Sequence, residues 1–209
     1  YWVFGFGEID MTKYDQLLCD YIIGRYRFYI PSFLLDIGCG KGNHVWSLQY
    51  RGIDALGIDR EDCNLETESI PKQDDFFDFV FCKSVIEHIH NTEHLLAETL
   101  RVLKPGGIAV FMTPDWNTDY KHFWDDPTHV KPFTRQGLEK AFKIAGFVDV
   151  DCQYFWQLPF LWRHPWLETL RWIISLLPDQ WKWNGTKQRV LIRHSKERML
   201  IVSARKGDK

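Results

Sequence analysis

The feature that most constrains this chain is a short apolar run that ends in three spaced glycines. Residues 33–37 read Phe-Leu-Leu-Asp-Ile, and Gly38, Gly40 and Gly42 follow at every second position. An apolar run of this length that stops at glycines is typical of a buried strand in a parallel sheet. Glycine allows a backbone turn with positive φ and the close approach of a ligand. The sequence therefore predicts an α/β domain with a ligand-binding loop after its first strand.

Predicted strands and helices alternate along the rest of the chain. We expect helices at residues 11–29, 42–51, 91–103, 134–145 and 165–177, and strands at residues 33–37, 55–58, 79–82, 108–112, 147–155 and 198–203. The last strand is expected to pair with residues 188–193 or to join the edge of the sheet. This alternation predicts a doubly wound, mostly parallel, Rossmann-like sheet of six or seven strands with an aromatic helical insertion before the last strand.

The length of 209 residues suits a single domain. Within residues 1–209 we expect four segments in chain order. They are an N-terminal helical segment (1–31), a ligand-binding core (33–155), the aromatic helical insertion (156–187) and closing strands (188–205).

The composition excludes several classes of protein. With 45% hydrophobic and 26% charged residues, the chain matches an ordinary globular protein. A net charge of −2 and the lack of a nucleic-acid-reading motif argue against a nucleic-acid partner. The five cysteines form no C-x-x-C pair, which argues against a disulfide framework or a zinc site of that type. We therefore expect a reducing, cytoplasmic location.

The glycine spacing separates the candidate cofactors. A dinucleotide fingerprint, G-x-G-x-x-G, would need glycine at position 43 or 45, where Asn43 and Val45 stand. A phosphate-binding loop would need Ser or Thr after Lys41, where Gly42 stands. Asp59 lies at the end of the next predicted strand, 23 residues after Asp36. A carboxylate at that place can accept hydrogen bonds from two ribose hydroxyls.

From about residue 33 to residue 147 the chain resembles the class I S-adenosylmethionine-dependent methyltransferases, in particular the methyltransferase type 11 group. The resemblance rests on LLDIGCGKG at 34–42, GID at 57–59, FFDFVFCKSVIEHI at 76–89, RVLKPGGIAVFMTP at 101–114 and FTRQGLEKAFKIAGF at 133–147. It implies the methyltransferase fold and S-adenosyl-L-methionine as cofactor. For the methionine end of the cofactor it implies Asp36 and the loop residues Gly38, Cys39, Gly40 and Gly42, and for the ribose it implies Asp59. Lys83, Ser84 and His88 are further expected cofactor-binding residues.

The chain departs from the usual pattern of this group after Asp59. Only 17 residues separate Asp59 from Phe77, where the usual member has a helix, a third strand and a loop with an acidic adenine contact. We therefore expect the helix to be missing and the third strand to be vestigial. Asn64 or Glu66 is the expected adenine contact.

Residues just after the strands are candidates for the acceptor side, because ligands of open α/β sheets lie outside the carboxyl ends of the strands. Methyl transfer depends mainly on positioning, and a general base is needed only for an acceptor that arrives protonated. His129 is the first candidate for that base, although a histidine that only fixes its loop is an equally good interpretation. His88 is the second candidate. His122 and Asp115 are either acceptor contacts or solvated loop residues.

A metal site could in principle form from Asp125, Asp126 and His129. Adjacent aspartates before a proline more often shape a turn, so no metal is expected there.

Residues 154–183 hold an unusual number of large aromatic side chains: Phe155, Trp156, Phe160, Trp162, Trp166, Trp172, Trp181 and Trp183. The charges and prolines in this stretch argue against a membrane-spanning helix. Residues 165–177 have the spacing of an amphipathic helix, whose apolar stripe we expect to pack on the sheet or on a second subunit in a homodimer. The alternative is a peripheral contact of residues 156–183 with the inner face of a membrane, helped by the basic residues after 182.

The favoured function is methyl transfer from S-adenosyl-L-methionine to a small-molecule, glycan or lipid-linked acceptor. The alternatives are a non-catalytic module that binds the same cofactor and, less favoured by the glycine spacing, an NAD(P)-dependent oxidoreductase.

Overall fold

The computed structural model describes residues 12–29, 32–178 and 187–208. Expectations for residues 1–11, 30–31, 179–186 and 209 lie outside the described residues, and these include Trp181 and Trp183.

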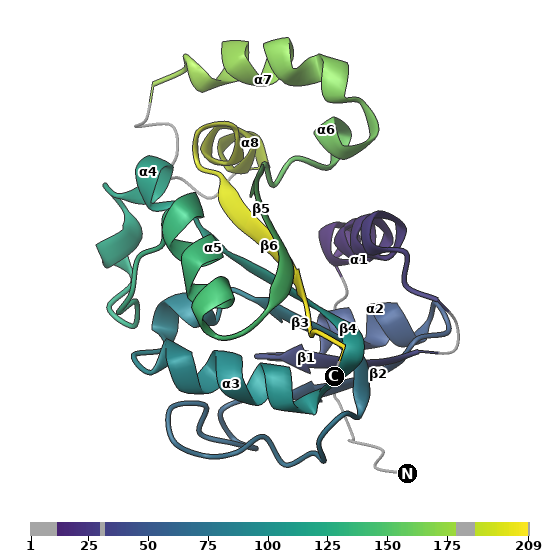
Figure 1. The fold of residues 1–209 in the computed structure, drawn as a ribbon. Coiled ribbons are helices and arrows are strands. Elements are labelled where there is room, and N and C mark those ends of the chain that lie inside the picture. The colour runs from purple at the N-terminus through teal and green to yellow at the C-terminus, as the bar shows by residue number, and fades with distance from the viewer. Residues whose placement is uncertain (1–11, 30–31, 179–186, 209) are drawn as a thin grey trace.

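The described part of the chain forms one mixed sheet of six strands (Figure 1). The strands are β1 (Phe33–Ile37), β2 (Asp54–Ile58), β3 (Phe77–Lys83), β4 (Leu103–Pro114), β5 (Val148–Phe155) and β6 (Met199–Arg205). Their order in the sheet is β2-β1-β3-β4-β6-β5. The first four are parallel, and β6 runs antiparallel to both of its neighbours. The predicted fold class and the six-stranded alternative are confirmed.

The helices surround this sheet. They are α1 (Lys13–Tyr26), α2 (Asn43–Gln49), α3 (Thr92–Val102), α4 (Trp116–Asp119), α5 (Arg135–Ile144), α6 (Pro159–Arg163), α7 (Glu168–Ser175) and α8 (Lys187–Lys196). The described residues also form three short 3-10 turns, η1 (Ile86–His88), η2 (Phe123–Asp125) and η3 (Pro165–Leu167). The predicted N-cap of α5 is confirmed, because the Thr134 hydroxyl accepts a hydrogen bond from the amide of Gly137.

Alternate side chains of each central strand enter two separate cores, as the two-residue period of a strand requires. Leu35 and Val80 pack into the core under α3 and α5, whereas Leu34 and Phe79 pack into the core under α1 and α2. Both faces of the sheet are therefore covered, which explains the continuous apolar runs in the sequence.

The stretch between β2 and β3 contains neither a helix nor a strand, as the short spacing after Asp59 predicts. It instead forms turns that place Cys63, Leu65 and Ile70 in the core beside α3. These three side chains cover the part of the sheet that a helix would otherwise cover.

Two expectations for the C-terminal part are wrong. Residues 188–193 belong to helix α8 rather than to a strand, and β6 lies between β4 and β5 rather than at the sheet edge. Ile192 and Ser195 are both buried and stand three residues apart, which is a helical spacing. With β4 and β5 on its two sides, β6 has no free edge for another strand to pair with.

The apolar stripe expected at residues 165–177 does form a helical segment, η3 followed by α7. It does not pack on the sheet, so that alternative is wrong, whereas packing on a second subunit stays a prediction. The exposed fractions are 73% for Trp166, 56% for Trp172 and 55% for Ile173, and α7 itself contains no buried residue. Figure 1 shows α7 lying over α8 at the end of the molecule, away from the sheet. Within the described residues no helix combines the length and the hydropathy needed to span a membrane.

Candidate functional site

The glycine loop between β1 and α2 is held against the end of β2. The amides of Gly38 and Cys39 donate to the Ile58 carbonyl at 2.8 and 3.1 Å. Gly38 has a φ of +75°, and a Cβ at this position would lie 2.1 Å from Cγ2 of Val85. Both the backbone conformation and the packing therefore require glycine at position 38.

The space beside Gly40 is open, whereas Val85 fills the space beside Gly38. Gly40 has a φ of +51°, and a Cβ built on it would meet nothing within 4 Å in the described part of the chain. Its amide donates to Oδ2 of Asp59 at 2.7 Å, so the carboxylate at the end of β2 touches the loop after β1. The loop uses the amides of Gly38, Cys39, Gly40 and Gly42 for internal hydrogen bonds. What it offers is open space above Gly40.

Asp36 is the most unusual group near this loop. It is 1% exposed, and its Oδ2 has no hydrogen-bond partner among the described residues. Burial raises the pKa of Asp36 to about 8, against the opposing effect of Lys83, and Asp59 raises it further. Burying a carboxylate without a partner is costly. A cationic ligand group placed here would satisfy Oδ2 and return the carboxyl to its charged form.

His44 is a neighbour of this site that the sequence did not single out. Its Nδ1 lies 3.9 Å from Oδ2 of Asp36, and its Nε2 lies 3.6 Å from Oδ1 of Asp15. Burial lowers the pKa of His44 to about 4, assisted by Lys83 and opposed by Asp15. Its position in the first turn of the helix after the glycine loop is a signal that could have identified it.

Residues 84–88 join the glycine loop to a pocket lined by several distant segments of the chain. Val85 packs on Gly38, while Ser84, Glu87 and His88 line the pocket. Ser84 has a φ of +56°, uncommon for a residue with a side chain, and its amide donates to the Met112 carbonyl at 2.8 Å. One short segment therefore borders both halves of the site.

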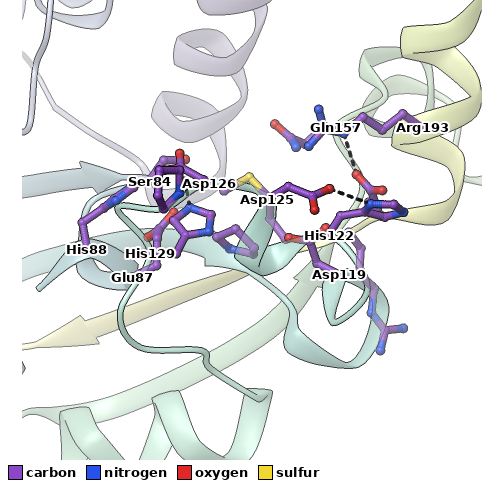
Figure 2. A pocket seen from close by; sticks show the side chains of 15 residues that line it. Ser84, Glu87, His88, Asp119, His122, Asp125, Asp126, His129, Gln157 and Arg193 are labelled. Atoms are coloured by element: carbon purple, nitrogen blue, oxygen red, sulfur yellow. Dashed lines mark hydrogen bonds and ion pairs between the residues drawn. The ribbon is translucent and has the colours of Figure 1, made fainter. Parts of the chain in front are cut away.

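The pocket has a volume of about 660 Å³ and is lined mainly by polar side chains. Figure 2 shows two groups along it. One group contains Glu87, His88 and His129, and the rings of the two histidines are 4.7 Å apart. The other contains Asp119 and His122, with Arg193 contributed by α8.

The histidines of the first group are held by hydrogen bonds through Nδ1. In His129 this nitrogen lies 2.6 Å from the Phe123 carbonyl, and in His88 it lies 3.1 Å from the Thr128 carbonyl and 2.9 Å from the Thr128 hydroxyl. The Glu87 carbonyl accepts the amides of Val130 and Lys131, so the loop that carries His129 is fastened to η1.

In the second group, Asp119 is 7% exposed and its Oδ1 has no hydrogen-bond partner among the described residues. Burial raises the pKa of Asp119 to about 6, and the nearby Glu197 raises it further, against Arg193. His122 is paired with Asp125 through Nδ1 at 2.9 Å. This end of the pocket can receive a hydrogen-bond donor from a ligand.

A family model described as a methyltransferase domain matches residues 28–151, more than half of the chain. The chain belongs to this methyltransferase domain family. The match confirms the expected class I family, and with it the cofactor class, S-adenosyl-L-methionine.

Similar proteins differ in their acceptors. This methyltransferase domain is 27% identical over 130 residues to a ubiquinone biosynthesis O-methyltransferase of Rickettsia typhi, covering 51% of this chain and 53% of the relative. It is 33% identical over 128 residues to phosphoethanolamine N-methyltransferase 2 of Caenorhabditis elegans, covering 51% of this chain and 29% of the relative. The chain thus spans about half the length, or less, of these curated relatives.

Solved structures confirm the fold. Phosphoethanolamine N-methyltransferase 2 of Haemonchus contortus, in complex with phosphomonomethylethanolamine and S-adenosylhomocysteine, superposes with a TM-score of 0.63 at 18% identity. The match covers 91% of this chain and 52% of that one.

Several residues expected at the site have other tasks in this methyltransferase domain. Both carboxylate oxygens of Glu66 accept backbone amides, from His90 and Asn91, and Asn64 accepts the amide of Glu66. These two residues brace the turn before α3, and their expected adenine contact stays a prediction. Asp115 is fully buried, is paired with Arg198 at 2.6 Å and does not line the pocket. The expectation that Asp115 is an acceptor contact or a solvated loop residue is therefore wrong.

From the sequence, Glu87 was a candidate only as one of the residues that follow a strand, and no pattern indicated the contribution of α8. Glu87 lies between two buried isoleucines, Ile86 and Ile89, and this apolar setting was the available signal. Arg193 and Glu197 come to the pocket because β6 enters the sheet beside β4, a pairing of distant segments that local patterns do not reveal.

Proposed function

We propose that this domain transfers a methyl group from S-adenosyl-L-methionine to an acceptor bound in the pocket beside His88 and His129. The observation that carries the proposal is the segment 84–88, in which Val85 packs on Gly38 while Ser84, Glu87 and His88 line the pocket. A cofactor over the glycine loop and an acceptor in the pocket would meet across this segment. Such in-line positioning supplies much of the rate of a displacement reaction.

We place the methionine end of the cofactor at Asp36 and over the loop of Gly38, Cys39, Gly40 and Gly42. The residues fit this role: the unpartnered Oδ2 of Asp36 suits a cationic amine, and the space above Gly40 allows a ligand to approach. Asp59 is placed at the ribose, with Lys83 and Ser84 beside the methionine end.

The cofactor supplies a methyl carbon on a cationic sulfur, which becomes a neutral thioether after transfer. A lone pair of the acceptor forms the new bond to that carbon while the carbon–sulfur pair remains on sulfur. An acceptor hydroxyl must also lose its proton. In neutral His129 the proton on Nδ1 is shared with the Phe123 carbonyl, so Nε2 carries the lone pair, 4.0 Å from Oδ2 of Asp126, which lines the same pocket.

An acceptor with a hydroxyl or amine group fits the polar lining best, since Asp119 and Glu87 each have an oxygen without a partner among the described residues. A small molecule or the polar head of a glycan or lipid-linked compound matches a volume of about 660 Å³. The named relatives, which act on oxygen or nitrogen according to their names, support a heteroatom acceptor.

The test is transfer of label from methyl-labelled S-adenosylmethionine to hydroxyl- and amine-bearing small molecules, glycans and lipid extracts. We expect transfer to at least one class, with His129→Gln reducing the rate by about 10²-fold or more while S-adenosylhomocysteine binding is retained. Binding of the cofactor without transfer to any class would instead support a non-catalytic module.

We also propose that the exposed apolar face of η3 and α7 rests on a lipid surface. This face consists of Trp166, Leu170, Trp172, Ile173 and Leu176, all exposed. Arg171 of α7 donates to the Ser195 carbonyl of α8 at 2.8 Å, and α8 supplies Arg193 to the pocket. A lipid-linked acceptor held at this surface would therefore be close to the pocket. A second subunit is the alternative occupant.

A further inference from the structure

Glu87, His88 and His129 form a compact set of potential metal ligands. Each offers one ligand atom, and these three atoms all lie within 4.8 Å of one another. Two of the residues stand at the end of η1 and the third comes from the loop after η2, so two separate segments converge on one point. The set lies at one end of the acceptor pocket (Figure 2).

Both imidazoles are oriented as metal ligands are. A carbonyl oxygen only accepts hydrogen bonds, so Nδ1 of His129 carries the proton that it shares with Phe123. The Thr128 hydroxyl donates to Asp126 at 2.6 Å, so it accepts from Nδ1 of His88, as the Thr128 carbonyl does. Each neutral ring therefore keeps its lone pair on Nε2. Metal-binding histidines almost always donate the other ring nitrogen to a carbonyl or carboxylate in this way.

Glu87 adds an independent sign that a ligand is expected. The residue is 1% exposed, and Thr113 donates to its Oε2 at 2.9 Å. Its Oε1 is buried and has no hydrogen-bond partner in the described part of the chain. An unsatisfied buried carboxylate oxygen costs free energy unless a cation or donor meets it. Burial raises the pKa of Glu87, and the two histidines oppose that rise.

We propose that Glu87, His88 and His129 bind a divalent transition-metal ion, with Zn²⁺ as the preferred ion. Two imidazoles and one carboxylate form a ligand set that suits Zn²⁺ and neighbouring transition ions better than Mg²⁺, which prefers oxygen alone. This set differs from the aspartate cluster considered from the sequence: only His129 is shared, and Asp125 and Asp126 are not among the ligands.

Three protein ligands leave a coordination position open toward the pocket. An acceptor hydroxyl in that position loses its proton to solvent more readily, because the metal stabilises the resulting oxygen anion. The role of His129 is then that of a ligand rather than of a proton acceptor. This inference rests on the proposed function, because it assigns the acceptor a hydroxyl oxygen.

The experiment is a Zn²⁺ titration by calorimetry of chelator-stripped protein without a polyhistidine tag. We expect one ion per chain for the wild type, and an affinity reduced by at least about tenfold in Glu87→Gln and in His129→Ala. His122→Ala is the matched control, a pocket histidine outside the ligand set, and should keep the wild-type affinity. Far-ultraviolet circular dichroism of each variant checks that the fold is retained.

Absence of stoichiometric Zn²⁺ binding by the folded wild type overturns the inference, as does an equal loss of affinity in His122→Ala and His129→Ala. S-adenosylhomocysteine binding is measured on the same stripped protein. Binding of that cofactor without binding of Zn²⁺ refutes the metal site and leaves the proposed function standing. Binding of Zn²⁺ without binding of S-adenosylhomocysteine supports the metal site and refutes the proposed function.

Discussion

The protonation state of Asp36 is expected to change when the cofactor binds. Because burial raises the pKa of Asp36 to about 8, the carboxyl is mostly protonated at pH 7 in the free protein. If a cationic amine binds there, the carboxyl must ionise and release its proton. Affinity for S-adenosylhomocysteine should therefore rise about tenfold from pH 6 to pH 7 and level off above pH 8.

Calorimetry of S-adenosylhomocysteine binding at pH 7 in phosphate and in Tris measures this release. For the wild type, which should release about one proton, we expect the two binding heats to differ by about the difference between the ionisation enthalpies of the two buffers. For Asp36→Asn the two heats should agree. Heats of wild-type binding that do not depend on the buffer would show that Asp36 does not ionise on binding.

Gly38 and Gly40 differ in a way that two alanine variants can resolve. Gly38→Ala should lower the free energy of unfolding by about 1–2 kcal/mol because of the left-handed conformation, and by about 1–3 kcal/mol more because of the clash with Val85. Gly40→Ala carries the conformational cost alone and should mainly weaken cofactor binding. Urea unfolding measures the stabilities. A smaller loss of stability in Gly38→Ala than in Gly40→Ala would contradict this account of the loop.

The sequence alone identified some candidate residues of the cofactor side, but not what makes other residues of the pocket unusual. Asp36 and Asp59 were identifiable because each ends a predicted strand and together they flank a distinctive glycine spacing. Glu87 was identifiable only as a residue that follows a strand, because its burial and its oxygen without a hydrogen-bond partner cannot be seen in the sequence.

At the scale of elements, the ion pair of Asp115 and Arg198 ties the end of β4 to the residue before β6. Asp115 is fully buried and also caps α4, whereas the Arg198 side chain is 22% exposed. Asp115→Ala should reduce the free energy of unfolding by about 3 kcal/mol, because it leaves the arginine unpaired and removes the cap. Glu139→Ala removes an exposed helical pair and should cost less than about 0.5 kcal/mol. Similar urea midpoints for the two variants would contradict this assignment.

The positions of β1, β3 and α5 were predicted within a few residues, because β1 and β3 are buried along nearly their whole length and α5 buries one face at helical spacing. Residues 188–193 were assigned to a strand because Val190, Leu191 and Ile192 favour one locally. Tertiary packing of α8 beneath α7 decided otherwise, and only the arrangement of distant segments contains that information.

At the scale of the whole molecule, the exposed face of η3 and α7 predicts association with lipid. Wild-type protein should sediment with anionic liposomes at low salt. Trp172→Gln should sediment less, because the substitution removes an exposed indole that would lie at the lipid surface. Tyr50→Gln, which changes an 87% exposed aromatic residue after α2, is the matched control. Protein that stays in the supernatant, or that elutes as a dimer through this face, would contradict the lipid contact.

We propose above all that S-adenosyl-L-methionine binds over the glycine loop with its ribose at Asp59, and equilibrium binding of S-adenosylhomocysteine tests this most directly. We predict saturable binding of one ligand per chain, weakened at least about tenfold by Asp59→Ala, which removes the acceptor for the ribose hydroxyls. Asp54→Ala, at the exposed opposite end of the same strand, should bind as the wild type does. No binding at millimolar ligand, or an affinity unchanged by Asp59→Ala, would contradict the claim.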